Sequence, residues 1–492
     1  MAGENGAPIV LKRVPTGAAG LDAILGGGFF EGGLYIVTGR PGAGKTTLAN
    51  QACFAKVAAG GRALYVTLLA ETHGRMLAHL SQMRFFEPAA VGGPLRYVNG
   101  FTAVQSEGLP GLLALLRDAV REHRADVLVL DGMPAITNLA EPAVDYKRFI
   151  SELQAWVAVM GCTVLLLTSE GSVAGERPEN TMVDGIVELS SGRRGMRSLR
   201  ELVVTKFRGS AYVEGAHAYA IGEDGVVVYP RVEAELVPEA TLPIRTDRLA
   251  FGVPGFDRML GGGVGGGSVT LALGSSGAGK SILGMHFLAE GARRGENVLH
   301  FGFFEMPPLV LARGDRLGME LSRYEREGRL SIRWHPPAER ILDELAYDLL
   351  DQVANRQVTR LFVDGLVGFK EAAHPERLAA FFSVLSKHLS ALGVTTVITE
   401  ETRELFIRQL EVPTPGVSAI FDNIVLLRQF ESGAELFRLA AIMKTRDSAH
   451  DRNLYRFEIT DSGIEIRDRF EGQGVLLGIP ERERSGSSGG GQ

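Results

Sequence analysis

The chain has 492 residues, which is too many for one ordinary hydrophobic core and predicts about two to four domains. Hydrophobic residues make up 45% of the chain and charged residues 22%, a balance that excludes a wholly disordered protein. The formal net charge of −6 provides no global attraction to a polyanion, which argues against a protein dedicated to coating DNA.

The cysteines and the N-terminal residues bear on the cellular compartment. Cys53 and Cys162 have no histidine or cysteine at ligand spacing, which argues against a disulfide framework and a zinc site and fits a reducing cytosol. The first residues lack a basic stretch followed by an apolar one, and no apolar run reaches about 18 residues. We therefore expect a soluble, cytoplasmic protein without a signal peptide or a membrane span.

In the first half of the chain, short apolar runs alternate with segments of helical spacing. The pattern predicts, in chain order, a strand at Leu34–Thr38, a helix at Lys45–Ala59, a strand at Ala63–Thr67, a helix at Leu109–His123, a strand at Val127–Leu130 that ends in Asp131, a helix at Tyr146–Met160 and a strand at Thr163–Leu167. Two more strands, Ile186–Leu189 and Glu201–Lys206, are expected on either side of a polar turn at Ser190–Arg200.

The second half repeats this order. The corresponding strands are expected at Val269–Leu273, Val298–Phe303, Leu361–Val363, Val394–Ile398 and Ile424–Leu427. Matching residues lie 235 positions apart for Asp22 and Asp257 and for Lys45 and Lys280, 233 apart for Asp131 and Asp364, and 238 apart for Lys206 and Lys444. A nearly constant separation over this length indicates duplication of a whole domain rather than an array of small repeats.

The alternation predicts an α/β fold, with a mostly parallel, twisted sheet and helices on both of its faces in each copy. We expect a first domain at residues 1–230, a linker at 231–248, a second domain at 249–479 and a disordered tail at 480–492.

Both copies contain a phosphate-binding motif, G-x-x-x-x-G-K-[ST], between a strand and a helix. Glycines let successive backbone amides point at a phosphate, the helix adds its positive N-terminal end, and the lysine reaches the β- and γ-phosphates. The residues expected to bind ATP are Gly39, Gly42, Ala43, Gly44, Lys45, Thr46 and Thr47 in the first copy and Gly274, Ser276, Gly277, Ala278, Gly279, Lys280 and Ser281 in the second. Two motifs in register predict tandem RecA-like P-loop NTPase domains.

A magnesium site is expected beside each P-loop. The hydroxyl groups of Thr46 and Ser281 are the expected ligands within the motif. Asp131 and Asp364 end buried strands, and each would supply a carboxylate as the second protein group of its magnesium site. The alternative is that each aspartate caps its own turn.

Each copy also carries a candidate catalytic carboxylate, at the end of the strand next to the phosphate loop. In the first copy it is Glu71, and in the second it is Glu305, one position earlier in the repeat. A carboxylate at such a place can polarise the attacking water or hydroxyl. The alternative is a solvated glutamate at a strand end.

These motifs, together with the Gly26–Phe30 run, Lys206–Ser210 and Lys444–Arg446, give the chain a resemblance to the KaiC family of double RecA-like ATPases. The resemblance extends from Thr16 to Asp451. It implies an ATP-dependent homohexamer with nucleotide between subunits. It also implies slow ATP hydrolysis in the N-terminal ring and autophosphorylation in the C-terminal ring.

By position in this family, Lys206, Arg208, Lys444 and Arg446 would reach the γ-phosphate bound by the neighbouring subunit. Cations supplied in this way stabilise the charge of the transferred phosphoryl group and complete the site only on assembly. The alternative is that they are ordinary cations on an exposed strand.

The sequence departs from the family at two places. Family members carry paired glutamates where this chain has Ala70-Glu71 and Glu305-Met306, which puts efficient hydrolysis in the N-terminal ring in doubt. The family's adjacent serine–threonine acceptor pair falls on Ser418-Ala419, so one acceptor remains: a two-site cycle is not available by this route, whereas a single-site autokinase is. Ser418 could equally be a loop serine that follows Pro415-Gly416.

Three functions remain open at this point. The first is a hexameric ATPase and autokinase that uses ATP and Mg²⁺ and controls an unidentified signalling protein. The second is a RecA-like motor on DNA, for which only the arginines of the segment 193–200 look suitable, so nucleic acid is not the expected partner. The third is a scaffold in which ATP joins subunits without turnover.

Overall fold

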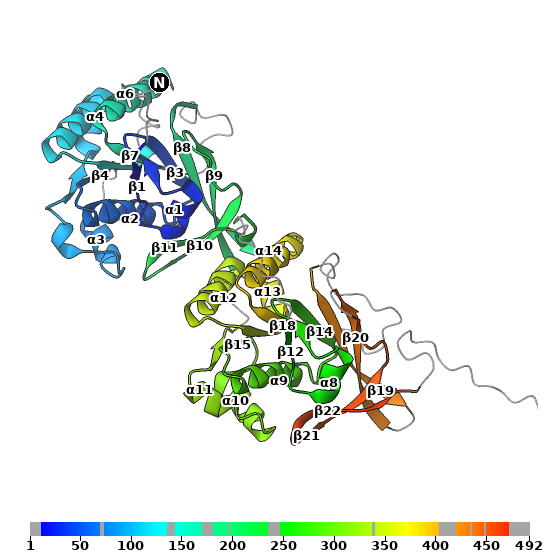
Figure 1. The fold of residues 1–492 in the computed structure, drawn as a ribbon. Coiled ribbons are helices and arrows are strands. Elements are labelled where there is room, and N and C mark those ends of the chain that lie inside the picture. Colours follow the sequence, from blue (N-terminus) through cyan, green and yellow to red (C-terminus); the bar gives the residue numbers. More distant parts are fainter. Residues whose placement is uncertain are drawn as a thin grey trace, which may run out of the picture. The chain divides into compact units, whose positions relative to one another are not determined.

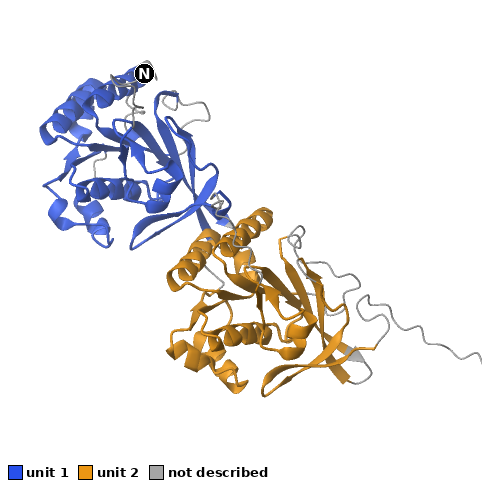
Figure 2. Ribbon diagram, in the orientation of Figure 1, with its two compact units in different colours: residues 1–234 blue, residues 235–492 orange. Residues whose placement is uncertain are grey.

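The computed structural model describes residues 11–68, 73–134, 143–169, 181–194, 197–234, 247–336, 340–402, 420–432, 435–446 and 449–471. The chain divides into two compact units, residues 1–234 and 235–492 (Figure 2). Within the described residues, each unit contains a nine-stranded sheet and a separate two-stranded sheet (Figure 1).

The large sheet of the first unit has the strand order β11-β10-β9-β8-β3-β7-β6-β4-β5. Its strands are β3 (Leu34–Gly39), β4 (Ala63–Thr67), β5 (Leu95–Asn99), β6 (Val127–Asp131), β7 (Thr163–Thr168), β8 (Gly185–Arg194), β9 (Arg197–Phe207), β10 (Ala216–Gly222) and β11 (Gly225–Tyr229), and the small sheet pairs β1 (Arg13–Val14) with β2 (Phe29–Phe30). The helices are α1 (Ala19–Leu25), α2 (Lys45–Ala58), α3 (His73–Leu80), α4 (Phe101–His123) and α6 (Ala143–Met160), with short 3₁₀ turns at Pro88–Ala90 and Val232–Ala234.

Both faces of this sheet are buried, because successive side chains of a strand point to opposite faces and both sets are apolar. Tyr35 and Val37 of β3 pack in the cluster that contains the apolar residues of α1 and α2. Leu34 and Ile36 pack in a second cluster with α4 and α6. Strands β3 to β8 run parallel to one another, so their carboxyl ends lie at one edge of the sheet.

The second unit repeats this arrangement with the strand order β16-β15-β17-β18-β14-β19-β20-β21-β22. Its strands are β14 (Val269–Gly274), β15 (Val298–Gly302), β16 (Leu330–Trp334), β17 (Arg360–Asp364), β18 (Thr395–Glu401), β19 (Asn423–Ser432), β20 (Glu435–Thr445), β21 (Tyr455–Thr460) and β22 (Gly463–Arg469), and β12 (Arg248–Leu249) pairs with β13 (Val264–Gly265). The helices are α8 (Pro254–Met259), α9 (Lys280–Arg293), α10 (Pro307–Arg316), α11 (Leu321–Arg326), α12 (Leu342–Arg356), α13 (Val367–Ala372) and α14 (Leu378–Ala391), with a 3₁₀ turn at Pro375–Arg377.

Helices again cover both faces. On one face, α8 and α9 share a cluster with Val397 of β18 and Val425 of β19. On the other, Phe369 of α13 stacks on Phe301 of β15 at 5.9 Å between ring centroids and also meets two phenylalanines of α14. The predicted fold class, two tandem α/β units with mostly parallel sheets between helices, is therefore confirmed.

Two local predictions were wrong. The segment Ser190–Arg200 is not a turn between two short strands, because β8 and β9 continue through it as a ladder that pairs Ser191 with Arg200 and Arg193 with Ser198. Polar side chains do not end a strand when the backbone hydrogen bonds continue on a partner strand. The helix expected from Leu109 begins at Phe101 and is interrupted at Gly108, whose φ of 64° and ψ of −151° are not helical.

Candidate nucleotide sites

The first P-loop joins β3 to α2 at the carboxyl edge of the sheet. Gly44 precedes α2 with a φ of 95°, and Gly279 precedes α9 of the second unit with a φ of 98°. This left-handed conformation favours glycine and turns the loop into the helix. Neither helix has a side chain that caps its N-terminus, so amide groups of the first turn remain available for a phosphate.

The P-loop lysines currently contact their own loops. Lys45 Nζ donates to the carbonyl oxygens of Gly39 and Arg40 at 2.6 and 3.0 Å. Lys280 Nζ donates to those of Gly274 and Ser275 at 2.9 and 2.7 Å. Thr46 and Thr47 lie in the first turn of α2 and Ser281 in that of α9. In the two loops, Ala43 and Ala278 are buried, whereas Gly42, Ser276 and Gly277 are exposed.

In the first unit, Asp131 at the end of β6 faces the P-loop helix. Thr46 Oγ1 donates to Asp131 Oδ2 at 3.1 Å, so the two predicted magnesium ligands lie together. The hydroxyl of Tyr65, on β4, donates to the same carboxylate oxygen at 2.7 Å. Burial, reinforced by the Asp131 carboxylate, raises the pKa of Tyr65 well above its usual value, so the phenol remains a donor.

The second unit repeats this pair with different supporting residues. Ser281 Oγ donates to Asp364 Oδ1 at 3.0 Å, and Thr399 Oγ1 of β18 donates to the same oxygen at 3.0 Å. The position of Tyr65 is taken by His300, which is 1% exposed and lies 4.0 Å from Asp364 Oδ2. Among the described residues, neither ring nitrogen of His300 has a hydrogen-bond partner.

The predicted carboxylate Glu305 lies just beyond β15, between the exposed side chains of Phe304 and Met306. Its Oε1 forms an ion pair of 2.7 Å with Arg313 of α10, and its Oε2 is buried without a hydrogen-bond partner among the described residues. Glu71 and the acceptor candidate Ser418 lie outside the described residues.

The expectation that Glu71 and Glu305 leave the strand next to the phosphate loop was wrong in space. Two strands separate β15 from β14, and two separate β4 from β3. In a doubly wound sheet, the next strand along the chain is not the neighbour in the sheet. The actual neighbours on that side are β7 and β18.

Sequence reasoning therefore missed the end of β18, where Thr399, Glu400 and Glu401 follow one another. Glu400 is 7% exposed and forms an ion pair with Lys370 of α13. Glu401 pairs in register with Gly274, the first P-loop residue. Burial lowers the pKa of Lys280, and the carboxylates of Glu401, Asp364 and Glu400 oppose that shift. The signal was available in the sequence as a carboxylate pair that ends a predicted strand.

The two Lys-x-Arg elements lie elsewhere, at the ends of β9 and β20. Lys206 Nζ and Arg208 Nη2 both donate to the carbonyl oxygen of Thr181, at 3.1 and 2.8 Å. Lys444 Nζ donates to the carbonyl oxygen of Phe421 at 2.7 Å, and Arg446 forms an ion pair of 3.0 Å with the carboxylate of Asp422. Burial, and then the neighbouring arginine, lowers the pKa of each lysine.

The fold and these sites define a tandem P-loop ATPase with two RecA-like domains, each of which has its P-loop at the carboxyl edge of its sheet. The family model described as "ATPase: KaiC" matches residues 14–233 and again residues 249–471. The chain therefore belongs to the KaiC family of ATPases.

Curated relatives match along nearly the whole chain. The circadian clock oscillator protein KaiC of Picosynechococcus is 25% identical over 495 residues, which cover 97% of this chain and 94% of that protein. KaiC of Thermostichus vulcanus is 26% identical and KaiC 1 of Synechocystis is 24% identical, each over 96% of this chain and 92% of the relative. In the part of the chain that the structure describes, no helix is both long and apolar enough to cross a membrane.

Proposed function

We propose that the protein is a ring-forming ATPase, a homohexamer of two stacked rings. Each nucleotide site is completed by the Lys-x-Arg element of a neighbouring subunit. The observation that carries this proposal is the position of the Lys-x-Arg elements at the edge of the sheet opposite to their own P-loops.

Strand β14 begins at Val269, whose amide donates to Asp422 Oδ2, and ends at Gly274 in the P-loop. At about 3.3 Å per residue, these two ends are about 16 Å apart. Arg446 holds Asp422 at the starting end, whereas Gln429 of β19 donates to the carbonyl oxygen of Gly277 at the P-loop end. Arg446 therefore cannot serve the nucleotide of its own unit.

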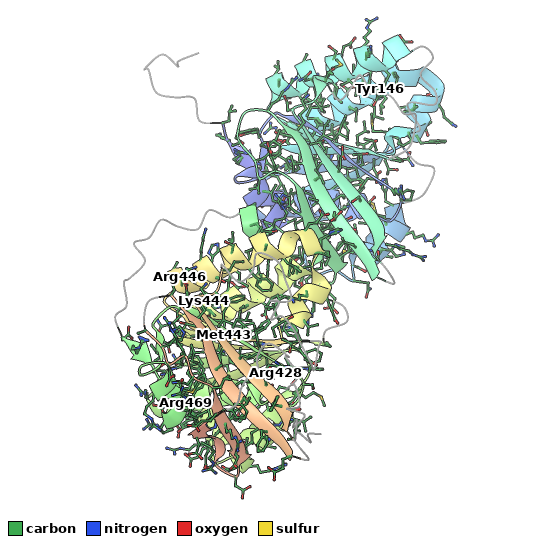
Figure 3. The ribbon with its side chains drawn as sticks, turned by 90° about the vertical axis from the view of Figure 1, so that its right-hand side faces the viewer. Tyr146, Arg428, Met443, Lys444, Arg446 and Arg469 are labelled. Atoms are coloured by element: carbon green, nitrogen blue, oxygen red, sulfur yellow. The ribbon has the colours of Figure 1, made fainter. Side chains whose placement is uncertain are left out.

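Figure 3 shows the same separation: Lys444 and Arg446 lie together at one end of the β19–β20 ladder, and Arg428 lies farther along it. The first unit follows this plan, because Lys206 pairs with Ile186 and Ile186 pairs with Ile36, near the start of β3. In each element, burial and then the charge of the neighbouring arginine lower the pKa of the lysine. Two adjacent cations on a surface remote from their own phosphate site suit an anion supplied by another subunit.

The residues around each P-loop fit a magnesium ion. A hydroxyl and a carboxylate already lie 3.1 Å apart in the first unit and 3.0 Å apart in the second, and these are the oxygen donors that Mg²⁺ prefers. Thr46 with Asp131, and Ser281 with Asp364, would hold the ion, directly or through water. The bound ion would neutralise charge on the β- and γ-phosphates, while Lys45 or Lys280 would leave its loop carbonyls to contact them.

In the second ring we propose phosphoryl transfer to Ser418 in addition to hydrolysis, with Glu305 as a candidate base. This proposal rests on the family membership and on the alignment of Ser418 with the family's acceptor pair. Because Ala419 follows it, the chain offers one acceptor there, which suits a one-site switch that reports nucleotide state to a signalling protein rather than an oscillator.

A subunit-mixing experiment tests the shared site. Lys280→Ala subunits lack a working P-loop, and Arg446→Ala subunits lack the cation that reaches the neighbour. Both carry Lys45→Ala, so that only the second ring is measured. Each variant alone should release almost no phosphate from Mg-ATP. Mixed before assembly, they should recover about a quarter of the parent rate, since one interface in four combines two intact halves.

A mixture that stays as inactive as its components would refute the shared site. Intact-mass measurement after incubation with Mg-ATP tests the kinase claim: one added phosphate, lost in Ser418→Ala and in Lys280→Ala, is the expected result. Assembled rings that hold ATP but release no phosphate and gain no mass would identify an ATP-dependent scaffold instead.

A further inference from the structure

The aspartate beside the first P-loop is held by two hydroxyl groups that share one of its oxygens. Thr46 Oγ1 donates to Asp131 Oδ2 at 3.1 Å, and the phenolic hydroxyl of Tyr65 donates to the same oxygen at 2.7 Å. Among the described residues, none donates to Asp131 Oδ1. The two hydroxyl groups thus fix one side of the carboxylate and leave the other side for a metal ion or a water bound to it.

Tyr65 reaches Asp131 from the neighbouring strand. It pairs in register with Val129 of β6, two residues before the aspartate, so its long side chain extends forward over the same face of the sheet. The residue is fully buried in the apolar cluster that contains α1 and α2, and its ring packs against that of Tyr97 at 5.5 Å between centroids. Close packing holds the ring in one orientation, so the hydroxyl is presented at one place.

The second unit supports its aspartate in the same way but from the opposite flanking strand. Asp364 Oδ1 accepts a hydrogen bond from Ser281 and another from Thr399 of β18, both at 3.0 Å. By their pairing with the P-loop strands, Thr399 corresponds to Leu167 of the first unit, which has no hydroxyl to donate. His300 corresponds to Tyr65, and its Nε2 lies 4.0 Å from Asp364 Oδ2, too far for a hydrogen bond.

Each aspartate therefore receives one hydroxyl from its P-loop helix and one from a flanking strand, β4 in the first unit and β18 in the second. A buried phenol needs a hydrogen-bond partner, and this need alone could account for Tyr65. It does not account for the exchange, in which the unit without the phenol has a threonine hydroxyl on the other side of its aspartate. The exchange indicates that the aspartate itself requires a second donor, as carboxylates that hold metal ions commonly do.

We propose that Tyr65 is a positioning residue of the first magnesium site, whose hydroxyl group holds one oxygen of Asp131 so that the other is presented to the ion or to its water. This inference rests on the proposed function, in which Thr46 and Asp131 hold Mg²⁺ together with the bound nucleotide. Tyr65 acts through Asp131 and does not itself touch the nucleotide. Its loss should therefore weaken the contribution of the metal to nucleotide binding and leave the binding of metal-free nucleotide as it is.

The test measures how much magnesium strengthens nucleotide binding at the first site. All proteins carry Lys280→Ala, which silences the second site. The dissociation constant of adenosine 5′-(β,γ-imido)triphosphate is measured by calorimetry with excess MgCl₂ and again with EDTA, and the ratio of the two constants is the gain due to the metal. Tyr65→Phe should reduce this ratio about tenfold, as expected when a metal ligand loses a hydrogen-bond partner, and should not change the constant in EDTA.

Two further variants separate positioning from a general effect on the fold. Tyr35→Phe removes another fully buried hydroxyl, which accepts a hydrogen bond of 2.9 Å from the amide of Phe30. It should lower the midpoint of urea unfolding without changing the ratio. Tyr65→Phe combined with Leu167→Thr moves the second donor to β7, the arrangement of the second unit, and should restore most of the ratio.

The outcomes separate the inference from the function on which it rests. An unchanged ratio in Tyr65→Phe would overturn the proposal, and so would an equal loss in Tyr35→Phe. A folded double variant whose ratio stays as low as that of Tyr65→Phe would refute the claim that Asp131 requires a second hydroxyl donor. A parent that binds the nucleotide equally well with magnesium and with EDTA would refute the proposed magnesium site itself, and the role of Tyr65 would fall with it.

Discussion

His286 is the group for which the structure predicts the clearest dependence on pH. It lies on α9, and its Nε2 accepts a hydrogen bond of 3.0 Å from the amide of Ile464 at the β21–β22 turn. Burial lowers the pKa of the imidazole from its usual value of 6.5 to about 4. The first unit has Gln51 at this position, and Gln51 Oε1 accepts from the amide of Val226 at 2.7 Å. In His286→Gln, the new glutamine can therefore accept the same backbone hydrogen bond as Gln51 does in the first unit.

The sign follows from which state binds the proton. Below a pH of about 6.5 the unfolded chain protonates His286, whereas the folded protein keeps the ring neutral until a pH of about 4. The contribution of His286 to the free energy of unfolding is therefore fully present above a pH of about 6.5. It is lost as the pH is lowered to about 4, and below that pH this residue causes no further change. A shift of 2.5 pKa units corresponds to about 3 kcal/mol, and partial solvent contact of the ring reduces the expected loss to about 2 kcal/mol.

Urea unfolding of the second unit measures this loss. The chain has two tryptophans, Trp156 in α6 and Trp334 in β16, so Trp156→Phe leaves a fluorescence reporter in the second unit only. Carboxylates also titrate in this range, and the difference between the parent and His286→Gln isolates the histidine. The parent should lose about 2 kcal/mol more than the variant between pH 7 and pH 4. Parallel losses in the two proteins would refute the reasoning.

Three further outcomes are expected. Glu296→Gln should destabilise the second unit by about 3–5 kcal/mol in the same urea assay, because it leaves the fully buried Arg360 guanidinium without its bidentate carboxylate. Glu344→Gln, which breaks a more exposed ion pair, is the control and should cost less than about 1 kcal/mol. Gly274→Ala should weaken ATP binding by the second unit, measured by calorimetry, because the new Cβ would lie 2.1 Å from the carbonyl oxygen of Leu427. Removal of magnesium with EDTA should abolish phosphate release from both sites, and retained release would contradict the proposed metal sites.

The sequence sufficed for the central layers of the fold because their signals are local and strong. The strands around β3 and β14 are continuous apolar runs, and the internal duplication supplies each assignment twice. The antiparallel strands β10, β11, β21 and β22 were not predicted. The segments of β10, β21 and β22 mix polar and apolar residues, whereas β11 is a short apolar run. All four form strands that extend an existing sheet edge, which is a long-range contact.

The difference between local signals and long-range contacts also explains which site residues could be predicted from the sequence. The P-loops and the strand-end aspartates were found because a motif and a strand end are visible along the chain, and the structure brings Thr46 to Asp131 and Ser281 to Asp364. Spatial order was not visible. It is the sheet order that brings β18 beside β14 and reveals Glu401, which lies 120 residues after Ser281, the last residue of the P-loop motif.

The duplication makes each unit a comparison for the other, and the comparison indicates where function has diverged. Tyr65 and His300 occupy one position beside the two aspartates, and Ser169 and Glu401 occupy another beside the two P-loops. The first change lies in the middle of β4 and β15, where Tyr65 and His300 are almost fully buried, and the second lies at the carboxyl ends of β7 and β18. Neither change alters the strand order of the sheet. A parallel sheet tolerates the exchange at the strand ends because side chains there contribute little to the core, whereas they determine the chemistry of the bound phosphate.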